Sequence, residues 1–193
     1  MPEEIDPCSV AHGAAPAAST AATSTAATSP SSPSLSAGFL APDRTLIAVF
    51  ASPVAAYLLR YASDAGYRPL LVEPDSDRAA GAAMSGFGVL GVMPDDIEGA
   101  DVVVTDHHRE ELGVVVRDAL LTKARWIGVM GNPRHPAPHI PALEALGVAP
   151  GDIARVHRPI GLNIGSRTPP EIAISTLAGL LADRNSRPGG FAF

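Results

Sequence analysis

Hydrophobic residues change their spacing in a regular order from about residue 43 onward. The run Thr45-Leu-Ile-Ala-Val-Phe50 is continuously apolar, as in a strand that is buried on both faces. Apolar side chains at helical spacing follow over residues 54–65, and Gly66 is placed to end that helix. Arg68-Pro-Leu-Leu-Val72 has the pattern of a second strand. Together these segments predict a β-α-β unit of about 30 residues.

The same alternation continues toward the C-terminus. Further elements are predicted as strands at 101–105 and 126–130, a helix over 112–120, and a short helix at 142–146 that ends at Gly147. Residues 132–141 include four prolines and cannot be helical throughout. Residues 76–99 are rich in Gly, Ala and Asp and predict no clear element.

The last helix has the clearest start. Thr168 is a capping residue, Pro169 occupies the first helical position, and Glu171 follows three residues after the cap. Apolar residues then recur over 173–181 and supply one face. A helix beginning at Thr168 is therefore predicted.

Buried strands that alternate with helices predict the fold class. We expect a Rossmann-like, doubly wound α/β domain over residues 43–185, with a mostly parallel sheet and helices on both faces. Residues 14–36 are almost wholly Ala, Ser, Thr and Pro, so residues 1–40 are expected to form a disordered tail. Residues 186–193 are expected to form a flexible C-terminus.

Composition and charge exclude several classes of function. The 193 residues carry a net charge of −6, and an acidic chain is not attracted to nucleic-acid backbones. The one cysteine, Cys8, permits neither an intrachain disulfide nor a zinc site built from cysteines, as is usual in a reducing cytoplasm. No apolar run approaches about 18 residues, and the acidic start does not match a secretory signal. A cytoplasmic protein without a membrane or nucleic-acid partner is expected.

The turn after the first strand lacks the glycines of a dinucleotide-binding loop. That loop usually reads Gly-x-Gly-x-x-Gly or Ala, but Phe50 and Ser52 occupy the first two glycine positions and only Ala55 agrees. Pro53 also removes a backbone N–H, so NAD(P) binding is disfavoured, although Ser52 could still cap the helix and donate one hydrogen bond. Glu73 ends the second strand, where an acid would take ribose hydroxyls or would simply be solvated.

The third predicted strand is followed by Thr105, Asp106, His107 and His108. Ligands of open α/β sheets bind beyond the carboxyl ends of strands, so this segment is a candidate ligand-contacting loop. Two histidines and an aspartate could bind a metal or transfer protons near neutral pH. Adjacent side chains in an extended segment point to opposite sides, which disfavours one ion held by both histidines, and no metal site is predicted. The alternative is an exposed entry to the next helix.

A second candidate loop follows the strand at 126–130. Gly131 permits close approach of a ligand to the backbone, and Arg134 offers a fork of donors suited to phosphate. The alternative is a surface turn with a solvated arginine.

The segment 159–168 has the highest density of residues typical of a binding loop. It contains Gly161, Asn163 and Gly165 and leads into the helix capped by Thr168. Backbone N–H groups at such a helix start, with a nearby arginine, would suit an anion, although the acid three residues after the cap competes for them.

Three blocks of sequence resemble the C-terminal Rossmann-like domain of the xanthine dehydrogenase accessory factor family (XdhC/CoxI). They are residues 100–108, residues 124–131 with Arg134, and residues 157–173, which include Pro-Ile-Gly-Leu-Asn-Ile-Gly. The family usually has Asp where Asn163 stands, and Thr-His-Asp-His where this chain has Thr-Asp-His-His. The resemblance extends over about residues 45–183.

The resemblance implies a role in the maturation of molybdenum hydroxylases as a binding protein rather than an enzyme. Members of the family bind molybdenum cofactor, support its sulfuration by a cysteine desulfurase, deliver it to the apoenzyme, and tend to be dimers. The implied cofactor is molybdopterin or its cytidine dinucleotide. The implied partners are the apoenzyme of a xanthine or carbon monoxide dehydrogenase, a cysteine desulfurase, and a separate protein of the N-terminal XdhC type.

Two departures from the family pattern leave alternatives open. The family's N-terminal domain with its functional cysteine has no counterpart in this sequence, and the usual loop Gly-x-Gly-His-Val-Ala keeps only Val54 and Ala55. The alternatives are an NAD(P)-dependent oxidoreductase and a non-catalytic interaction module that has lost cofactor binding. No catalytic residue is predicted.

Overall fold

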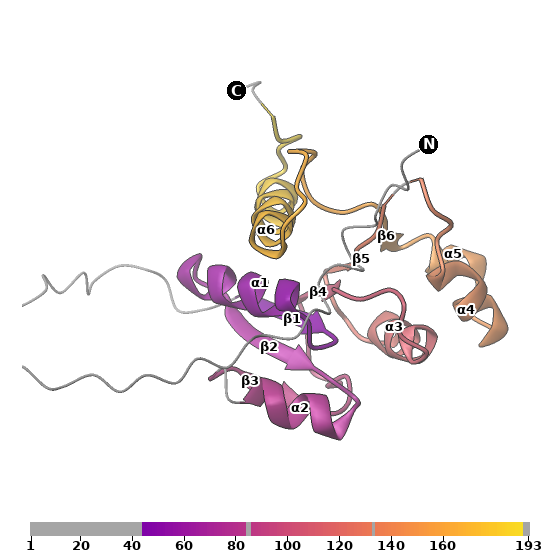
Figure 1. Ribbon diagram of the computed structural model, residues 1–193. Coiled ribbons are helices and arrows are strands. Elements are labelled where there is room, and N and C mark those ends of the chain that lie inside the picture. Colours follow the sequence, from indigo (N-terminus) through magenta and orange to yellow (C-terminus); the bar gives the residue numbers. More distant parts are fainter. Residues whose placement is uncertain (1–43, 84–85, 133, 191–193) are drawn as a thin grey trace, which may run out of the picture.

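The computed structural model describes residues 44–83, 86–132 and 134–190 (Figure 1). Within them, six parallel strands form one sheet in the order β3-β2-β1-β4-β5-β6. The strands are β1 (Thr45–Val49), β2 (Arg68–Val72), β3 (Gly88–Leu90), β4 (Asp101–Val104), β5 (Trp126–Val129) and β6 (Val156–His157). The helices are α1 (Pro53–Asp64), α2 (Ser76–Ala83), α3 (Leu112–Leu121), α4 (His139–Ala145), α5 (Pro150–Ile153) and α6 (Pro169–Arg184).

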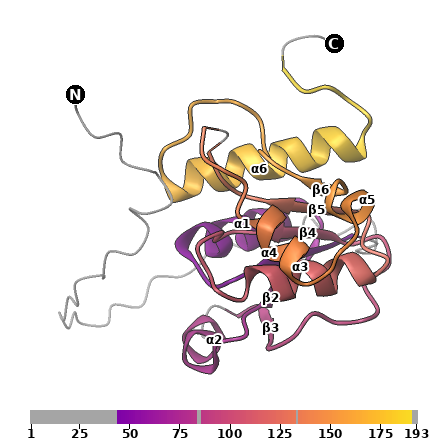
Figure 2. The same ribbon diagram turned by 90° about the vertical axis from the view of Figure 1, so that its right-hand side faces the viewer.

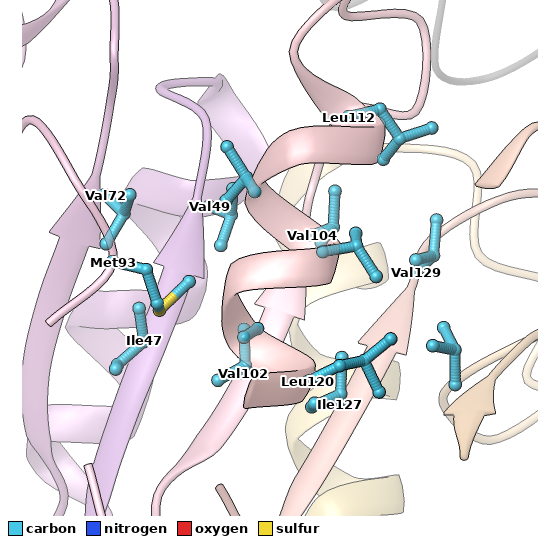
Figure 3. Close-up of a cluster of buried hydrophobic side chains, with 14 of the residues drawn as sticks. Ile47, Val49, Val72, Met93, Val102, Val104, Leu112, Leu120, Ile127 and Val129 are labelled. Atoms are coloured by element: carbon cyan, nitrogen blue, oxygen red, sulfur yellow. The ribbon is translucent and has the colours of Figure 1, made fainter. Parts of the chain in front are cut away.

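Helices cover both faces of the sheet, as the alternation of elements predicts (Figure 2). On one face, α1 and α6 pack on alternate residues of the central strands, including Leu46, Ala48 and Val103. On the other face, α3 packs on the intervening residues, including Ile47 and Val102 (Figure 3). Both sets are fully buried because parallel strands with helices on both faces have no solvated side. The continuous apolar runs of the sequence follow from this arrangement.

The structure confirms the Rossmann-type fold and adds elements that the sequence did not indicate. Residues 76–99, which predicted nothing clear, contain α2 and β3, and residues 150–157 contain α5 and β6. These elements have two to eight residues, too few to show a period. The short helix expected at 142–146 begins earlier, at His139.

Several predictions about the ends of the chain lie partly or wholly outside the described residues. These are the tail at residues 1–40, which includes Cys8, and the last three residues of the predicted flexible C-terminus. The described residues 186–190 are neither helix nor strand. None of the described helices is long and apolar enough to cross a membrane.

Candidate functional site

The carboxyl ends of the strands lie along one edge of the sheet, because every strand pair is parallel. The strand order reverses at the neighbouring strands β1 and β4, and open α/β sheets bind ligands at such a point. The turn after β1 and the loop after β4 meet there. Their contact is a hydrogen bond between the hydroxyls of Ser52 and Thr105, whose oxygens are 2.9 Å apart. The fold therefore brings together two of the predicted site residues.

The two hydroxyls are satisfied within the protein. Thr105 Oγ1 donates its one proton toward the carbonyl oxygens of Phe50 at 2.9 Å and Val49 at 3.1 Å. Ser52 must then donate to Thr105, since a hydroxyl has one proton. Ser52 Oγ also accepts the backbone N–H of Ala55 at 3.0 Å, which confirms the predicted cap. The proton that Ser52 could have donated to a ligand is directed to Thr105.

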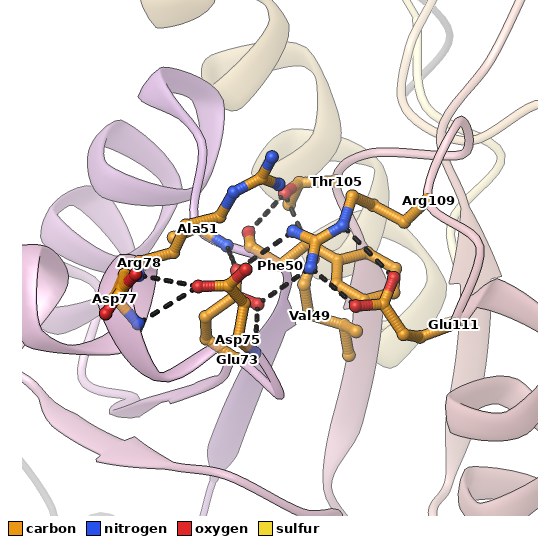
Figure 4. Close-up of polar contacts among 10 residues, drawn as sticks. All are labelled: Val49, Phe50, Ala51, Glu73, Asp75, Asp77, Arg78, Thr105, Arg109 and Glu111. Carbon is orange, nitrogen blue, oxygen red and sulfur yellow. Dashed lines mark hydrogen bonds and ion pairs between the residues drawn. The ribbon is translucent and has the colours of Figure 1, made fainter.

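Glu73 is completely buried at the end of β2 (0% exposed). Its carboxylate accepts the backbone N–H groups of Ala51 at 2.7 Å and Asp75 at 3.0 Å. The guanidinium of Arg109 adds hydrogen bonds of 3.3 Å from Nη1 and 3.1 Å from Nη2 (Figure 4). The alternative of a solvated carboxylate is wrong, and ribose hydroxyls could reach Glu73 only if Arg109 moved away.

Arg109 lies over this part of the edge. Its guanidinium is 4.7 Å from the ring centroid of Phe50 and also donates to Glu111 at 2.9 and 3.2 Å. Burial by itself would lower the pKa of Arg109, but hydrogen bonds and charge from Glu111 and Glu73 raise that pKa above its ordinary value. We call the four residues Phe50, Glu73, Arg109 and Glu111 the arginine clasp. With two carboxylates and one cation, the clasp has a net charge of −1 and repels a pyrophosphate.

The loop after β4 forms a turn at its two histidines. Asp106 Oδ1 accepts the backbone N–H of His108 at 3.0 Å, and the rings of His107 and His108 lie 4.0 Å apart, tilted by 37°. The expectation that these rings point to opposite sides is wrong, because the segment is a turn rather than extended. Thr105, Asp106 and His107 are buried, whereas His108 is exposed. In the described ranges, no three His, Cys, Asp or Glu side chains are grouped to hold a metal ion.

The loop after β5 is held by Arg158, a residue that the sequence did not single out. Arg158 donates to the carbonyl oxygens of Asn132 at 3.2 Å and His135 at 3.1 Å. A Cβ placed on Gly131 would lie 2.7 Å from Nε of Arg158, so the guanidinium packs directly on the glycine backbone. Arg134 is exposed on the same loop, and its backbone N–H donates to Asn132 Oδ1 at 2.9 Å. The close approach that Gly131 permits is therefore made by Arg158.

His139 lies in the first turn of α4 and is 3% exposed. Its Nδ1 has no hydrogen-bond partner in the described part of the chain. Burial, and then the charge of Arg158, lower the pKa of His139 below its ordinary 6.5. The imidazole is therefore neutral in the folded protein near pH 7.

The fold is expected to lose stability as the pH falls below 6.5, because unfolded His139 then binds a proton that folded His139 does not. The loss approaches about 1.4 kcal/mol per pH unit. Replacing His139 with phenylalanine should reduce the difference between urea unfolding free energies measured at about pH 7.5 and about pH 5.5. His108→Phe, at an exposed position, is the control and should change that difference little. If the unfolding free energy changed equally with pH in both variants, His139 would not be the source of the pH dependence.

The loop after β6 is packed against α6 through glycines. Gly161 has φ +85°, and a Cβ on Gly179 would lie 2.9 Å from the Cα of Gly161. Ser175 secures this contact, because its carbonyl accepts the N–H of Leu162 at 3.0 Å and its hydroxyl donates to the carbonyl of Leu162. Gly161 therefore lets the loop approach α6, a role that sequence analysis missed.

The outer part of this loop is exposed up to the start of α6. Asn163, Gly165 and Thr168 are all exposed. The Glu171 carboxylate accepts the backbone N–H groups of Arg167 at 2.9 Å and Thr168 at 3.1 Å, and these bonds lower the pKa of Glu171. The helix starts where predicted, and Glu171 takes the N–H groups that an anion would need.

A buried ionic cluster lies at the opposite, amino-terminal edge of the sheet. Asp101, at the start of β4, is fully buried and accepts hydrogen bonds from Nε of Arg125 at 2.8 Å and Nε of Arg184 at 2.7 Å. Arg184 comes from α6, so this cluster joins α6 to the sheet. Its place away from the carboxyl edge assigns it to stability rather than to ligand binding.

The carboxyl edge therefore has two different halves. Beside β1 and β2, the arginine clasp fills the position where a nucleotide would meet its ribose-binding acid. Beside β4, β5 and β6, three successive loops expose His108, Arg134 and Asn163. The predicted site residues are thus divided between a buried half and an exposed polar half.

These features define a Rossmann-type domain in which side chains of the protein itself bond across the crevice at β1, β2 and β4. A family model described as the XdhC Rossmann domain matches residues 46–180, so the chain belongs to that family. The chain is also similar to the uncharacterized protein YqeB of Escherichia coli (strain K12), with 36% identity over 101 residues. That match covers 52% of this chain and only 18% of YqeB.

A crystal structure described as a xanthine dehydrogenase from Bacillus halodurans has a similar fold. The TM-score is 0.56 at 20% sequence identity, and the match covers 75% of this chain and 45% of the other. The chain therefore spans less than half of that protein, and the likeness concerns the fold.

Proposed function

We propose that this chain is an accessory factor for a molybdenum hydroxylase of the xanthine or carbon monoxide dehydrogenase type. The observation that carries the proposal is the position of the three sequence blocks typical of the XdhC family. They form the loops after β4, β5 and β6, which are neighbouring strands of the sheet. A ligand that bridged these loops would contact all three blocks at once.

The exposed half of the carboxyl edge fits a pterin phosphate by its chemistry. Arg134 is a forked donor for phosphate, and the Asn163 amide and the His108 imidazole can pair with a heterocycle edge. The arginine clasp disfavours an anion at the other half. When bound, molybdenum cofactor supplies the redox chemistry of the client enzyme. The residues of this chain would bind and orient the cofactor, and they would perform no turnover.

The partners follow from this role. We infer that the chain meets a hydroxylase apoenzyme, and that a cysteine desulfurase and a separate protein of the N-terminal XdhC type act with it during sulfuration or insertion. A homodimer would present two such edges. Each partner can be sought by co-purification from the native host.

Binding of molybdenum cofactor to the purified chain tests the proposal. We expect molybdenum and pterin to co-elute with the protein in gel filtration, and the dissociation constant to rise about tenfold in Arg134→Ala, the loss expected for a charged hydrogen bond. Arg117→Ala is the matched control, since Arg117 is a partly exposed arginine on α3 that pairs with Asp118. No co-elution, together with normal hydroxylase activity in a deletion strain, would reject the proposal.

The arginine clasp argues against the alternative of an NAD(P)-dependent oxidoreductase, because Glu73 is already bonded to Arg109. A fluorescence titration with NADH or NADPH should show no saturable signal. The interaction-module alternative has one supporting observation, the exposed side chains of Ile164 (55%) and Ile174 (50%) beside the loop after β6. Co-purification with a hydroxylase subunit that is unaffected by Arg134→Ala but lost in Ile164→Asp would favour it.

A further inference from the structure

A hollow of about 360 Å³ lies between α1 and α2, beside the turn after β1. Small side chains of both helices form its walls, and Leu59, Leu71 and Phe87 add larger apolar surface. None of the four residues of the arginine clasp lines it. Ala51 and Ser52 of the turn after β1 also line it, so the hollow adjoins the clasp on the side of α1 and α2 without including it.

The hollow is open because α2 is capped at its start and touches the core only through partly buried residues such as Ala82. Asp75 caps α2, accepting the backbone N–H groups of Asp77 at 3.0 Å and Arg78 at 2.9 Å. No residue of α2 is buried. A Cβ placed on Gly81, which lines the hollow, would meet no atom within 4 Å. The wall formed by α2 thus leaves room for a ligand.

The charge at the hollow selects an anion. Arg78 is the one charged residue among the described residues that line it. In the described ranges its guanidinium forms no salt bridge, and its charge acts on Asp75 and Glu111 only at longer range. Figure 4 shows the Arg78 side chain reaching from α2 toward the turn at Ala51. A guanidinium in this position can offer two parallel hydrogen bonds to a phosphate.

We propose that this hollow binds a nucleoside monophosphate, with the base between α1 and α2 and the phosphate on Arg78. A flat ring suits the space between two walls of small side chains, and one arginine matches one phosphate. Small-molecule sites usually measure about 300–1,000 Å³, so the hollow suits a mononucleotide better than a dinucleotide. Nucleotide binding at this site needs no hydroxylase client, so it can be tested separately from the proposed accessory role.

Isothermal titration calorimetry on the full chain tests the site, with AMP, CMP, adenosine and inorganic phosphate as probes. AMP or CMP should bind, and adenosine should bind about tenfold more weakly because it lacks the phosphate. Arg78→Gln should reduce nucleotide affinity to that of adenosine. Gly81→Leu should abolish binding by filling the hollow, and its melting temperature should not fall, because leucine favours helix more than glycine does.

Ala80→Leu is the matched control, since Ala80 is an exposed neighbour on α2 that does not line the hollow. This variant should bind AMP like the wild type. The proposal is overturned if neither nucleotide binds to the wild type at millimolar concentration, or if Gly81→Leu binds as tightly as Ala80→Leu. Equal affinities for AMP and adenosine, or saturable binding of inorganic phosphate alone, would overturn the assigned ligand.

Discussion

Replacing Glu73 with alanine is expected to destabilise the protein by about 3–5 kcal/mol, the usual loss when one partner of a buried ion pair is removed. The variant would leave the N–H groups of Ala51 and Asp75 without their acceptor. It would also leave Arg109, whose side chain is 10% exposed, without its buried partner. Urea unfolding followed by far-ultraviolet circular dichroism measures the loss.

Glu111→Ala is the matched control for this prediction. It removes another carboxylate from the same arginine, but the Glu111 side chain is 38% exposed and bonds to no other residue in the described segments. Its loss should therefore be below about 1 kcal/mol, as for surface ion pairs. If Glu73→Ala and Glu111→Ala had similar effects, the buried carboxylate would not be what secures the turn after β1.

Gly128→Val is expected to destabilise the protein by on the order of 3 kcal/mol, the upper end of typical overpacking. Gly128 lies within β5, and a Cβ there would overlap the ring of Trp126 and lie 2.8 Å from Cγ2 of Ile160. The indole would have to leave its stacked position on His157, where the ring centroids are 5.0 Å apart. Trp126 is the one tryptophan of the sequence, so its fluorescence reports the displacement directly.

The control for this substitution is Gly91→Val. Gly91 is exposed, and a Cβ there would meet no atom within 4 Å. Its effect should stay within about 0.5 kcal/mol, as for ordinary surface positions. Unchanged fluorescence and stability in Gly128→Val would mean that the sheet accommodates the added side chain at Trp126.

Local patterns were enough to predict the main elements. The continuous apolar runs at Thr45–Val49 and Trp126–Val129 mark strands buried on both faces, and the Thr168 cap marks the start of α6. Short elements such as β6 could not be found this way, because two residues carry no period. The Ser52 cap was predictable because it involves residues only three apart.

The partners of the candidate site residues were much harder to predict. Arg109 was overlooked, although an arginine directly after the candidate loop, beside two glutamates, was a usable signal. Its pairing with Glu73 joins residues 36 positions apart, and no local pattern specifies such a contact. Arg158 on Gly131 and Gly161 on Gly179 are also long-range contacts, so glycines that suggested ligand approach prove to accommodate the chain's own atoms.

The sequence by itself determined the Rossmann-type class, the family and the absence of the phosphate-loop glycines, because spacing, caps and motifs are local properties. Only the tertiary structure decided what became of the nucleotide crevice. Folding brings the ends of β1, β2 and β4 together, so that Glu73, Phe50 and Arg109 satisfy one another where a ribose would bind. Burial of a carboxylate requires a partner, and in this chain that partner is an internal arginine rather than a ligand.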